Sequence, residues 1–215
     1  MQSSTESRNS RKRGRANLIR LFLKTPTPLI ADAMDGENTL SCLRPVLAGI
    51  AIVGPVVTVK TDATDWGTVV SAIEVASPRD VLFIDSSGSN VAVWGGLTSR
   101  AAQQRGVVGT IVFGSCRDIP TIETLQYPVW IKGITPRAGR PLNKGKVNVP
   151  IKIGGVEVKP GDLAKADVHG VIVIPSNEVA SVAERVIEIV AKERLIEGGL
   201  KDGQSLSELI SDFPS

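Results

Sequence analysis

Hydrophobic positions in the middle of the chain follow two alternating patterns: short continuous apolar runs, and apolar residues spaced three or four apart. The runs predict buried strands, and the spaced positions predict amphipathic helices. The segment from Asp65, for example, places Val69, Ile73 and Ala76 on one helical face and stops at Pro78. The predicted elements are a strand over 49–60 with a bend at Gly54-Pro55, a helix over 65–77, a strand over 81–84, a helix over 96–105, a strand over 108–113 and a helix over 119–125.

The pattern changes after residue 126. Short strand-like segments separated by glycine and proline follow, and then one long amphipathic helix begins at Ser176 or Asn177 and runs to about Leu195. The short segments lie at 127–132, 147–153, 156–158 and 171–174, with a hairpin turn at Gly154-Gly155. Parallel βα units followed by short strands and a closing helix predict an α/β fold, built as a single domain of three layers, β/β/α.

The composition agrees with such a fold. The chain has 215 residues, which suits one domain, and it is 42% hydrophobic but only 4% aromatic, so the expected core is aliphatic and β-branched. A helix is expected over 16–24, and a second, short one is expected with Thr27 as its N-cap and Pro28 as its first residue, ending at Gly36. We divide the chain into a basic N-terminal extension with a short helix (1–25), the α/β domain (26–197) and a C-terminal tail (198–215), and we expect the last fifteen residues to fray.

The sequence pI of about 9.0 has a local origin. Residues 1–20 contain six Lys or Arg against one acid, which leaves a formal charge of +5 there and −2 over the rest of the chain. This segment is typical of a solvated extension. A nucleic-acid arm is the alternative, although no aromatic residue lies among the charges to stack on bases. Cys42 and Cys116 cannot by themselves form a disulfide framework or a zinc site, and we expect neither a membrane span nor a signal peptide, which favours the cytoplasm.

Two loops that follow predicted strands can carry chemistry, because open α/β sheets bind ligands beyond the carboxyl ends of their strands. The first contains Gly95, Gly96 and Leu97 at the start of a helix, where backbone N–H groups suit a carboxylate or a phosphate. The second contains Arg117 and Asp118, an anion-binding guanidinium beside a ligand for hard cations. The alternatives are a tight packing turn in the first loop and a surface Arg–Asp pair that caps the next helix in the second.

The spacing of these loops resembles a known family. Gly96, followed by twenty residues and then Arg117-Asp118, is similar to the G-X20-R-D signature of RraA-like proteins and the related class II pyruvic aldolases. Segments similar to the family follow one another in the same order across about residues 26–195: 27–35, 54–59, 72–82, 105–109, 135–137, 147–150, 160–162 and 170–175. The resemblance implies a three-layer, swivelling-domain-like RraA-like fold, and homotrimers that sometimes stack as hexamers.

The resemblance also implies an activity: a divalent-metal-dependent lyase that cleaves a C–C bond next to a pyruvyl group. The implied substrates are small 2-oxo acids such as 4-hydroxy-4-methyl-2-oxoglutarate, 4-carboxy-4-hydroxy-2-oxoadipate and oxaloacetate. Asp118 would bind Mg²⁺ or Mn²⁺, Arg117 the substrate carboxylate and keto oxygen, and backbone N–H groups around Gly95, Gly96 and Leu97 the pyruvyl carboxylate. A metal and a guanidinium stabilise a developing enolate without a Schiff-base lysine. The alternative is a non-catalytic regulator that binds a ribonuclease or another protein partner.

The sequence departs from the aldolases at two positions. They usually carry acids where this chain has Gly96 and Thr121, and the nearest acid, Glu123, lies two residues further on. Losing these proton carriers favours decarboxylation of oxaloacetate over aldol cleavage, because CO₂ leaves without a base removing a hydroxyl proton. We interpret His169 as a turn residue and Cys116 as a packing residue, and we assign Trp66 and Trp94 to the core or an interface.

Overall fold

The computed structural model describes residue 14 and residues 16–211. Most of the basic charge predicted for the N-terminal extension therefore lies outside the described residues, but the helix expected over 16–24 is present. Within the described part of the chain, no helix is both long enough and apolar enough to span a bilayer.

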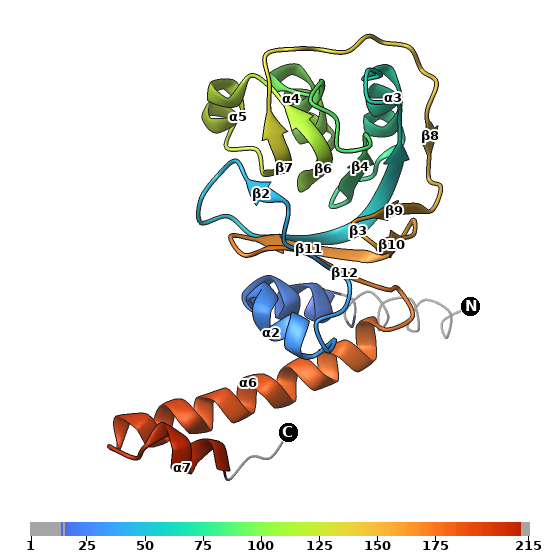
Figure 1. Ribbon diagram of the computed structural model, residues 1–215. Coiled ribbons are helices and arrows are strands. Elements are labelled where there is room, and N and C mark those ends of the chain that lie inside the picture. The colour runs from blue at the N-terminus through green and yellow to red at the C-terminus, as the bar shows by residue number, and fades with distance from the viewer. Residues whose placement is uncertain (1–13, 15, 212–215) are drawn as a thin grey trace, which may run out of the picture.

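A parallel sheet with helices on one face forms the upper half of the molecule (Figure 1). Its apolar runs pair in the order β3-β4-β6-β7, with the short strand β5 beside β6. The amphipathic faces of three helices pack on it around buried aliphatic residues such as Val69, Leu82 and Val112. These elements are β3 (Ile52–Lys60), α3 (Gly67–Val75), β4 (Val81–Asp85), β5 (Ala92–Trp94), α4 (Gly96–Arg105), β6 (Gly109–Cys116), α5 (Ile119–Leu125) and β7 (Val129–Ile134).

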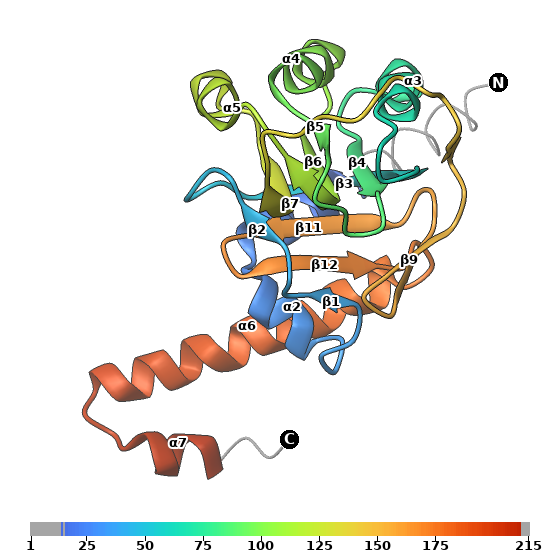
Figure 2. The ribbon, with the colours of Figure 1, turned by 45° about the horizontal axis from the view of Figure 1, so that its top comes forward.

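Beyond β3 the same sheet curls into a second, antiparallel layer (Figure 2). A separate two-stranded hairpin turns at Gly154-Gly155, as predicted, and packs against this layer. Between the two layers lies a second core, which includes Phe83, Ile111 and Trp130. The strands of this layer are β1 (Thr39–Leu40), β11 (Leu163–Asp167) and β12 (Gly170–Ile174), and the hairpin consists of β9 (Ile151–Ile153) and β10 (Val156–Val158). Two short antiparallel strands pair with the parallel sheet instead: β2 (Arg44–Pro45) with β7 and β8 (Lys146–Val147) with β3. The α/β class with two β layers under helices is thus confirmed.

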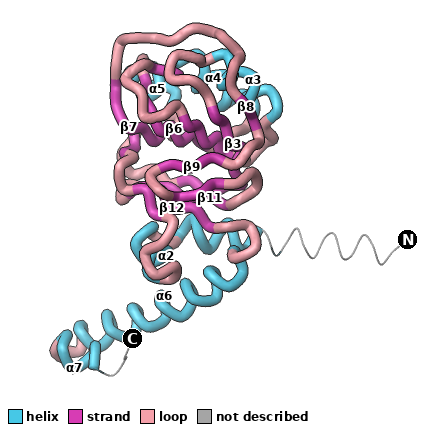
Figure 3. The backbone as a smooth tube through the Cα atoms, turned by 45° about the vertical axis from the view of Figure 1, so that its right-hand side comes forward, coloured by secondary structure: helices cyan, strands magenta, loops and turns pink. Residues whose placement is uncertain are grey.

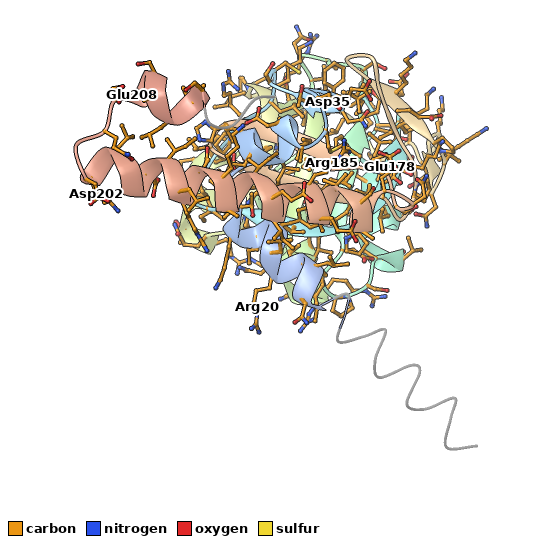
Figure 4. All side chains as sticks on the ribbon, turned by 90° about the horizontal axis from the view of Figure 1, so that it is seen from below. Arg20, Asp35, Glu178, Arg185, Asp202 and Glu208 are labelled. Carbon is orange, nitrogen blue, oxygen red and sulfur yellow. The ribbon has the colours of Figure 1, made fainter. Side chains whose placement is uncertain are left out.

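The structure has one layer more than the three (β/β/α) that the sequence predicted. This fourth layer is helical and covers the outer face of β11 and β12. Helix 16–24, α2 (Thr27–Asp32) and α6 (Val179–Lys201) enclose a third core that contains Phe22, Ile172 and Val186. Arg185 Nη1, on α6, lies 3.6 Å from Asp35 Oδ2, just after α2; Figure 4 labels both residues on this face of the molecule. The four layers are therefore α/β/β/α.

The C-terminal region is more ordered than the sequence predicted. Helix α6 continues past Leu195 to Lys201, and α7 (Leu206–Ser211) folds back along it, with Leu209 buried against Gly199. The prediction that the C-terminal residues fray is therefore wrong for residues 206–211, because Leu209 in this polar segment packs against the small residue Gly199. The far end of α6 and α7 project beyond the body (Figures 1 and 4).

Three local expectations are also corrected. Strand β3 is continuous at Gly54-Pro55, because its first half pairs with β11 and its second half with β4, so the proline falls where the pairing partner changes. Thr27 is the first residue of α2 and does not cap it, and α6 begins after Glu178. Strand β11 was not predicted, since Lys165 and Asp167 interrupt its apolar pattern.

Candidate active site

Arg117 and Asp118 lie where β6 ends and α5 begins. Asp118 has a left-handed backbone (φ 57°, ψ 38°), a conformation that aspartate tolerates better than most residues, and it turns the chain sharply into the helix. Its carboxylate Oδ2 lies 3.4 Å from Arg117 Nε, and each side chain is about two-fifths exposed (43% and 41%). The two charges of the predicted pair are thus in contact and accessible.

The glycine turn faces this pair. The N–H of Gly96 donates to Asp118 Oδ2 at 3.2 Å, and the N–H of Arg117 donates to the Trp94 carbonyl at 3.1 Å. A Cβ on Gly95 would lie 2.8 Å from Asp118 Oδ2 and 3.2 Å from Arg117 Cγ, so only glycine allows this approach. The structure therefore brings together the two loops that the sequence places twenty residues apart.

The N–H groups of the turn already have partners in this structure. Gly95 donates to Thr98 Oγ1 at 2.9 Å, and Gly96 donates to Asp118 as described. Leu97 follows in the first turn of α4, and the residue is 83% exposed. Binding of a substrate carboxylate by these N–H groups stays a prediction, and it requires the Gly96 N–H to exchange Asp118 for the ligand.

A cavity of about 470 Å³ opens beside Arg117, Asp118 and Gly95. Helices α3 and α4 form its sides, and the segment 135–145, which we call the strap, contributes Ala138 as it crosses from β7 to β8 (Figure 3). The other lining residues are mostly apolar: Trp66, Val70, Ile73, Glu74, Ala92, Val93, Trp94, Leu97, Thr98 and Ala101. The site lies beyond the carboxyl ends of parallel strands, as the sequence predicted.

Asp65 holds the strap in place. The sequence marks it as the start of a helix, and in the structure it is fully buried just before α3, where its carboxylate accepts the N–H of Gly67 at 2.8 Å. It also accepts N–H groups of the strap, from Leu142, Asn143 and Lys144, at 2.9–3.0 Å. The sequence showed only an aspartate before a predicted helix. It did not indicate that this aspartate binds a segment nearly eighty residues further along the chain.

The donor set near Asp118 fits one class of metal ion. No group of three or more His, Cys, Asp or Glu that could hold a metal occurs among the described residues, which argues against a closed zinc centre there. Mg²⁺ and Mn²⁺ can be held by a single carboxylate, with water and substrate oxygens as the other ligands. Asp118 offers such a carboxylate at the edge of the cavity. The residues present therefore fit a hard divalent ion.

The two positions that depart from the aldolases touch each other. A Cβ on Gly96 would lie 2.8 Å from Thr121 Cγ2 and 3.4 Å from Asp118 Cβ. The two positions at which this chain lacks an acid therefore adjoin each other and Asp118. Glu123, the nearest acid along the chain, is exposed on α5 and does not line the cavity.

The remaining candidates have structural roles. Cys116 is fully buried, and this burial raises the pKa of its thiol to about 12, so it is a packing residue and no thiolate nucleophile. His169 is exposed in the β11–β12 turn, where its N–H donates to Asp167 Oδ1 at 2.9 Å. Trp94 is 2% exposed, stacks on Tyr127 and donates to Ser99 Oγ at 2.8 Å, so it is a core residue that also borders the cavity.

Comparisons with known proteins agree with this arrangement. Residues 27–173 match the family model RraA-like, described as Aldolase/RraA. A Halalkalibacterium halodurans protein, provisionally named 4-hydroxy-4-methyl-2-oxoglutarate aldolase, is 35% identical over 188 residues, which are 86% of this chain and 90% of that protein.

Two solved structures are similar in fold. An uncharacterised protein from Pseudomonas syringae has a TM-score of 0.82 at 25% identity, over 92% of this chain and 94% of that one. The RNA-processing inhibitor RraA from Thermus thermophilus has a TM-score of 0.66 at 28% identity, over 71% of this chain and 93% of that one. Since the family model matches more than half of its residues, this chain belongs to the RraA-like family.

Proposed function

We propose that the protein is a divalent-metal-dependent lyase acting on a 2-oxo acid, of the oxaloacetate decarboxylase or 4-hydroxy-4-methyl-2-oxoglutarate aldolase type. The observation that carries the proposal is the convergence of Arg117, Asp118 and the Gly95–Gly96 turn on one cavity. The name of the Halalkalibacterium relative supports the same reaction class.

The roles follow from the chemistry of the side chains. Arg117 binds the substrate carboxylate and keto oxygen through its planar fork of donors, and its permanent charge opposes the negative charge that develops on the enolate of pyruvate. Asp118 is the residue that would hold Mg²⁺ or Mn²⁺, which supplies Lewis-acid stabilisation of the same charge when bound. Among the described residues that line the cavity there is no lysine, so a Schiff base has no candidate there.

Decarboxylation of oxaloacetate is the easier reaction for this set of residues. Aldol cleavage requires a base to take the proton of the substrate hydroxyl, and the positions where the aldolases carry acids are Gly96 and Thr121 here. In decarboxylation the electron pair of the breaking bond stays on the pyruvyl fragment, CO₂ departs, and solvent supplies the proton.

The test is oxaloacetate decarboxylation with Mg²⁺ or Mn²⁺, followed by enzymatic detection of pyruvate. We expect Arg117→Lys and Asp118→Asn each to lower kcat/KM by about 100-fold or more, as for other groups that stabilise a developing charge. Arg100→Lys, on α4, and Asp80→Asn, before β4, do not line the cavity and are the matched controls. Activity that survives EDTA or Asp118→Asn would refute the metal role.

A second candidate function is a non-catalytic regulator that binds a ribonuclease or another protein partner. The similarity to the RNA-processing inhibitor RraA and the missing acids at positions 96 and 121 favour it. It predicts that the chain slows RNA cleavage by a purified ribonuclease, and that Asp118→Asn leaves this inhibition unchanged. We also expect a homotrimer or hexamer, which light scattering during size-exclusion chromatography will measure.

A further inference from the structure

The strap carries a concentration of positive charge. Between Glu123 and Glu157 the chain has six Lys or Arg and no acid, and three of these cations, Arg137, Arg140 and Lys144, belong to the strap. Outside its first twenty residues the chain as a whole has a net charge of −2, so the strap differs in sign from the body that it crosses. It passes α4 and α3 on its way from β7 to β8 (Figures 1 and 2). A surface segment of one charge sign therefore runs beside the candidate active site.

Backbone hydrogen bonds fix the two arginines of the strap at the edge of the cavity. The carbonyl of Arg137 accepts the N–H of Ala92 at 2.7 Å, and the carbonyl of Arg140 accepts the N–H of Trp66 at 3.0 Å. Both of these donors line the cavity, and so does Ala138, which lies between the arginines in sequence. Since consecutive Cα atoms are about 3.8 Å apart, the Cα atoms of both arginines lie within about 8 Å of the Cα of Ala138.

Lys144 is fixed in a similar way. Its N–H donates to Asp65 Oδ2 at 2.9 Å, one residue before the cavity residue Trp66. The side chains of the three strap cations are exposed, and none of the salt bridges in the described part of the chain involves them. Asp62 interacts electrostatically with Lys144 and offsets part of its charge. The charge of the two arginines is not offset by an ion pair and acts on the surrounding solvent.

The residues that line the cavity do not supply this positive charge. They include one cation, Arg117, and two acids, Asp118 and Glu74, so their formal charges sum to −1. Arg117 and Asp118 also neutralise each other, because they lie 3.4 Å apart. The three cations of the strap outweigh the lining residues, and a cleft with apolar walls focuses the field of charges at its edge. The strap therefore makes the approach to the cavity positive.

We propose that Arg137, Arg140 and Lys144 attract the substrate to the cavity over a distance and thereby favour 2-oxo acids with two carboxylates over those with one. The inference rests on the proposed function, because it assumes that the cavity binds an anionic 2-oxo acid. A dianion such as oxaloacetate interacts twice as strongly with each cation as the monoanion pyruvate does. Attraction over a distance raises the local concentration of the substrate without contact with the reacting atoms, so it lowers KM and leaves kcat unchanged.

The test removes the three charges from the full chain by the combined substitutions Arg137→Gln, Arg140→Gln and Lys144→Gln. At separations on the order of 10 Å in water, this change weakens the attraction of a dianion about twentyfold at an ionic strength of about 0.01 M. At about 0.1 M the factor falls to about fivefold, because the Debye length shortens from about 30 Å to about 10 Å. The KM for oxaloacetate at constant Mg²⁺ should rise by these factors, with kcat unchanged.

Dissociation constants measured by calorimetry test the same inference without turnover. For the dianion 2-oxoglutarate the dissociation constant should rise by the factors expected for oxaloacetate. For pyruvate, which carries half the charge, it should rise only by the square roots of these factors, about fourfold at about 0.01 M and about twofold at about 0.1 M. The preference of the wild type for dianions should therefore shrink in the variant, and most strongly at low salt.

Two variants are the controls. One removes the same amount of charge from exposed positions in the helical layer on the far side of the two β layers, and it should leave KM unchanged: Arg20→Gln with Lys24→Gln and Lys201→Gln. The other combines Arg137→Lys with Arg140→Lys. It should behave as the wild type does, because attraction over a distance depends on the charge and not on the planar donor fork of the guanidinium.

The outcomes separate this inference from the function on which it rests. If the wild type neither binds nor converts any 2-oxo acid, the proposed function fails and the inference falls with it. If the wild type is active, the inference alone is overturned by an unchanged KM, by a change in KM that is equal at both ionic strengths, or by equal effects on pyruvate and 2-oxoglutarate. A lowered kcat, or the same rise in KM in the far-side control, would also overturn it, because the first indicates a disturbed site and the second a general effect of net charge.

Discussion

Replacing Asp65 by asparagine should loosen the strap and destabilise the whole fold. In the wild-type protein one buried carboxylate accepts four N–H groups and a hydroxyl at 2.7–3.0 Å, from Gly67, Thr68, Leu142, Asn143 and Lys144, and a second hydroxyl, that of Thr61, at 3.3 Å. Asparagine keeps the shape but turns one acceptor oxygen into an N–H₂ donor. At least one backbone N–H of these partners then faces another donor and stays unpaired.

The size of the effect follows from these contacts. A hydrogen bond to a charged group contributes about 1.5–3 kcal/mol, and a buried donor left without a partner costs about 1–3 kcal/mol. Because the variant keeps part of the network as weaker neutral bonds, we expect Asp65→Asn to lower the free energy of unfolding by about 2–4 kcal/mol. Urea unfolding followed by circular dichroism will measure this loss, and hydrogen exchange of the amides of residues 142–144 will show where it occurs.

The effect should depend on pH with a defined sign. Burial by itself raises the pKa of Asp65, but the hydrogen bonds from Thr68, Lys144 and Asn143 outweigh it and hold the pKa well below its usual range. A lowered carboxyl pKa stabilises the folded state above the unfolded-state pKa of about 4, and this stabilisation is lost as the pH falls through the folded-state value. The difference between wild type and Asp65→Asn should therefore be constant from about pH 5 to 7 and shrink below about pH 4.

The matched control is Asp62→Asn. Asp62 lies three residues earlier, is exposed and accepts hydrogen bonds only within its own loop, from Thr64, so its loss should affect stability much less. Equal unfolding midpoints for Asp65→Asn and wild type, unchanged protection of residues 142–144, or a stability difference that does not shrink between about pH 4 and pH 2 would each refute this account of the strap.

Three further predictions concern buried contacts. Tyr127→Phe should lower the free energy of unfolding by about 1–2 kcal/mol, because it leaves the buried Thr110 hydroxyl without its partner at 2.9 Å. The ring should still stack on Trp94, so the fluorescence of Trp94 should be retained. A loss of less than about 0.3 kcal/mol in urea unfolding would contradict this prediction. Lys165→Met should lower stability at pH 7, because it leaves the largely buried Asp167 carboxylate without the ammonium group that lies 3.9 Å from it. Since burial lowers the pKa of Lys165, the wild type gains stability as the pH rises toward about 10.4, a gain that the variant should lack in alkaline urea titrations. Gly96→Ala should lower the free energy of unfolding by about 1–3 kcal/mol, because the added methyl group would collide with Thr121, and a second substitution, Thr121→Ala, should reduce this loss. If the effects of the two substitutions are additive in a double-mutant cycle, the two positions are independent and the explanation is wrong.

The accuracy of the sequence prediction differs along the chain for physical reasons. The bounds of α4 and α5 agree with prediction, because Gly106 and the Arg117-Asp118 turn are strong local stop and start signals. Strand β11 was missed, since its charged residues are buried only because helix 16–24 and α2 cover them: Asp167 accepts the Thr27 N–H and hydroxyl, and Lys165 donates to the Leu23 carbonyl. No local pattern reveals such distant partners.

The amino-acid sequence alone determined the class of fold, the order of the βα units and the pair of loops that form the candidate site, because periodicity, glycine positions and the Gly96-to-Arg117 spacing are local properties of the chain. The contact between Asp118 and the glycine turn, the strap held by Asp65 and the apolar extent of the cavity depended on the tertiary structure. Each of these joins segments that are remote in sequence, and only the packing of the curled sheet against its helices decides which remote segments meet.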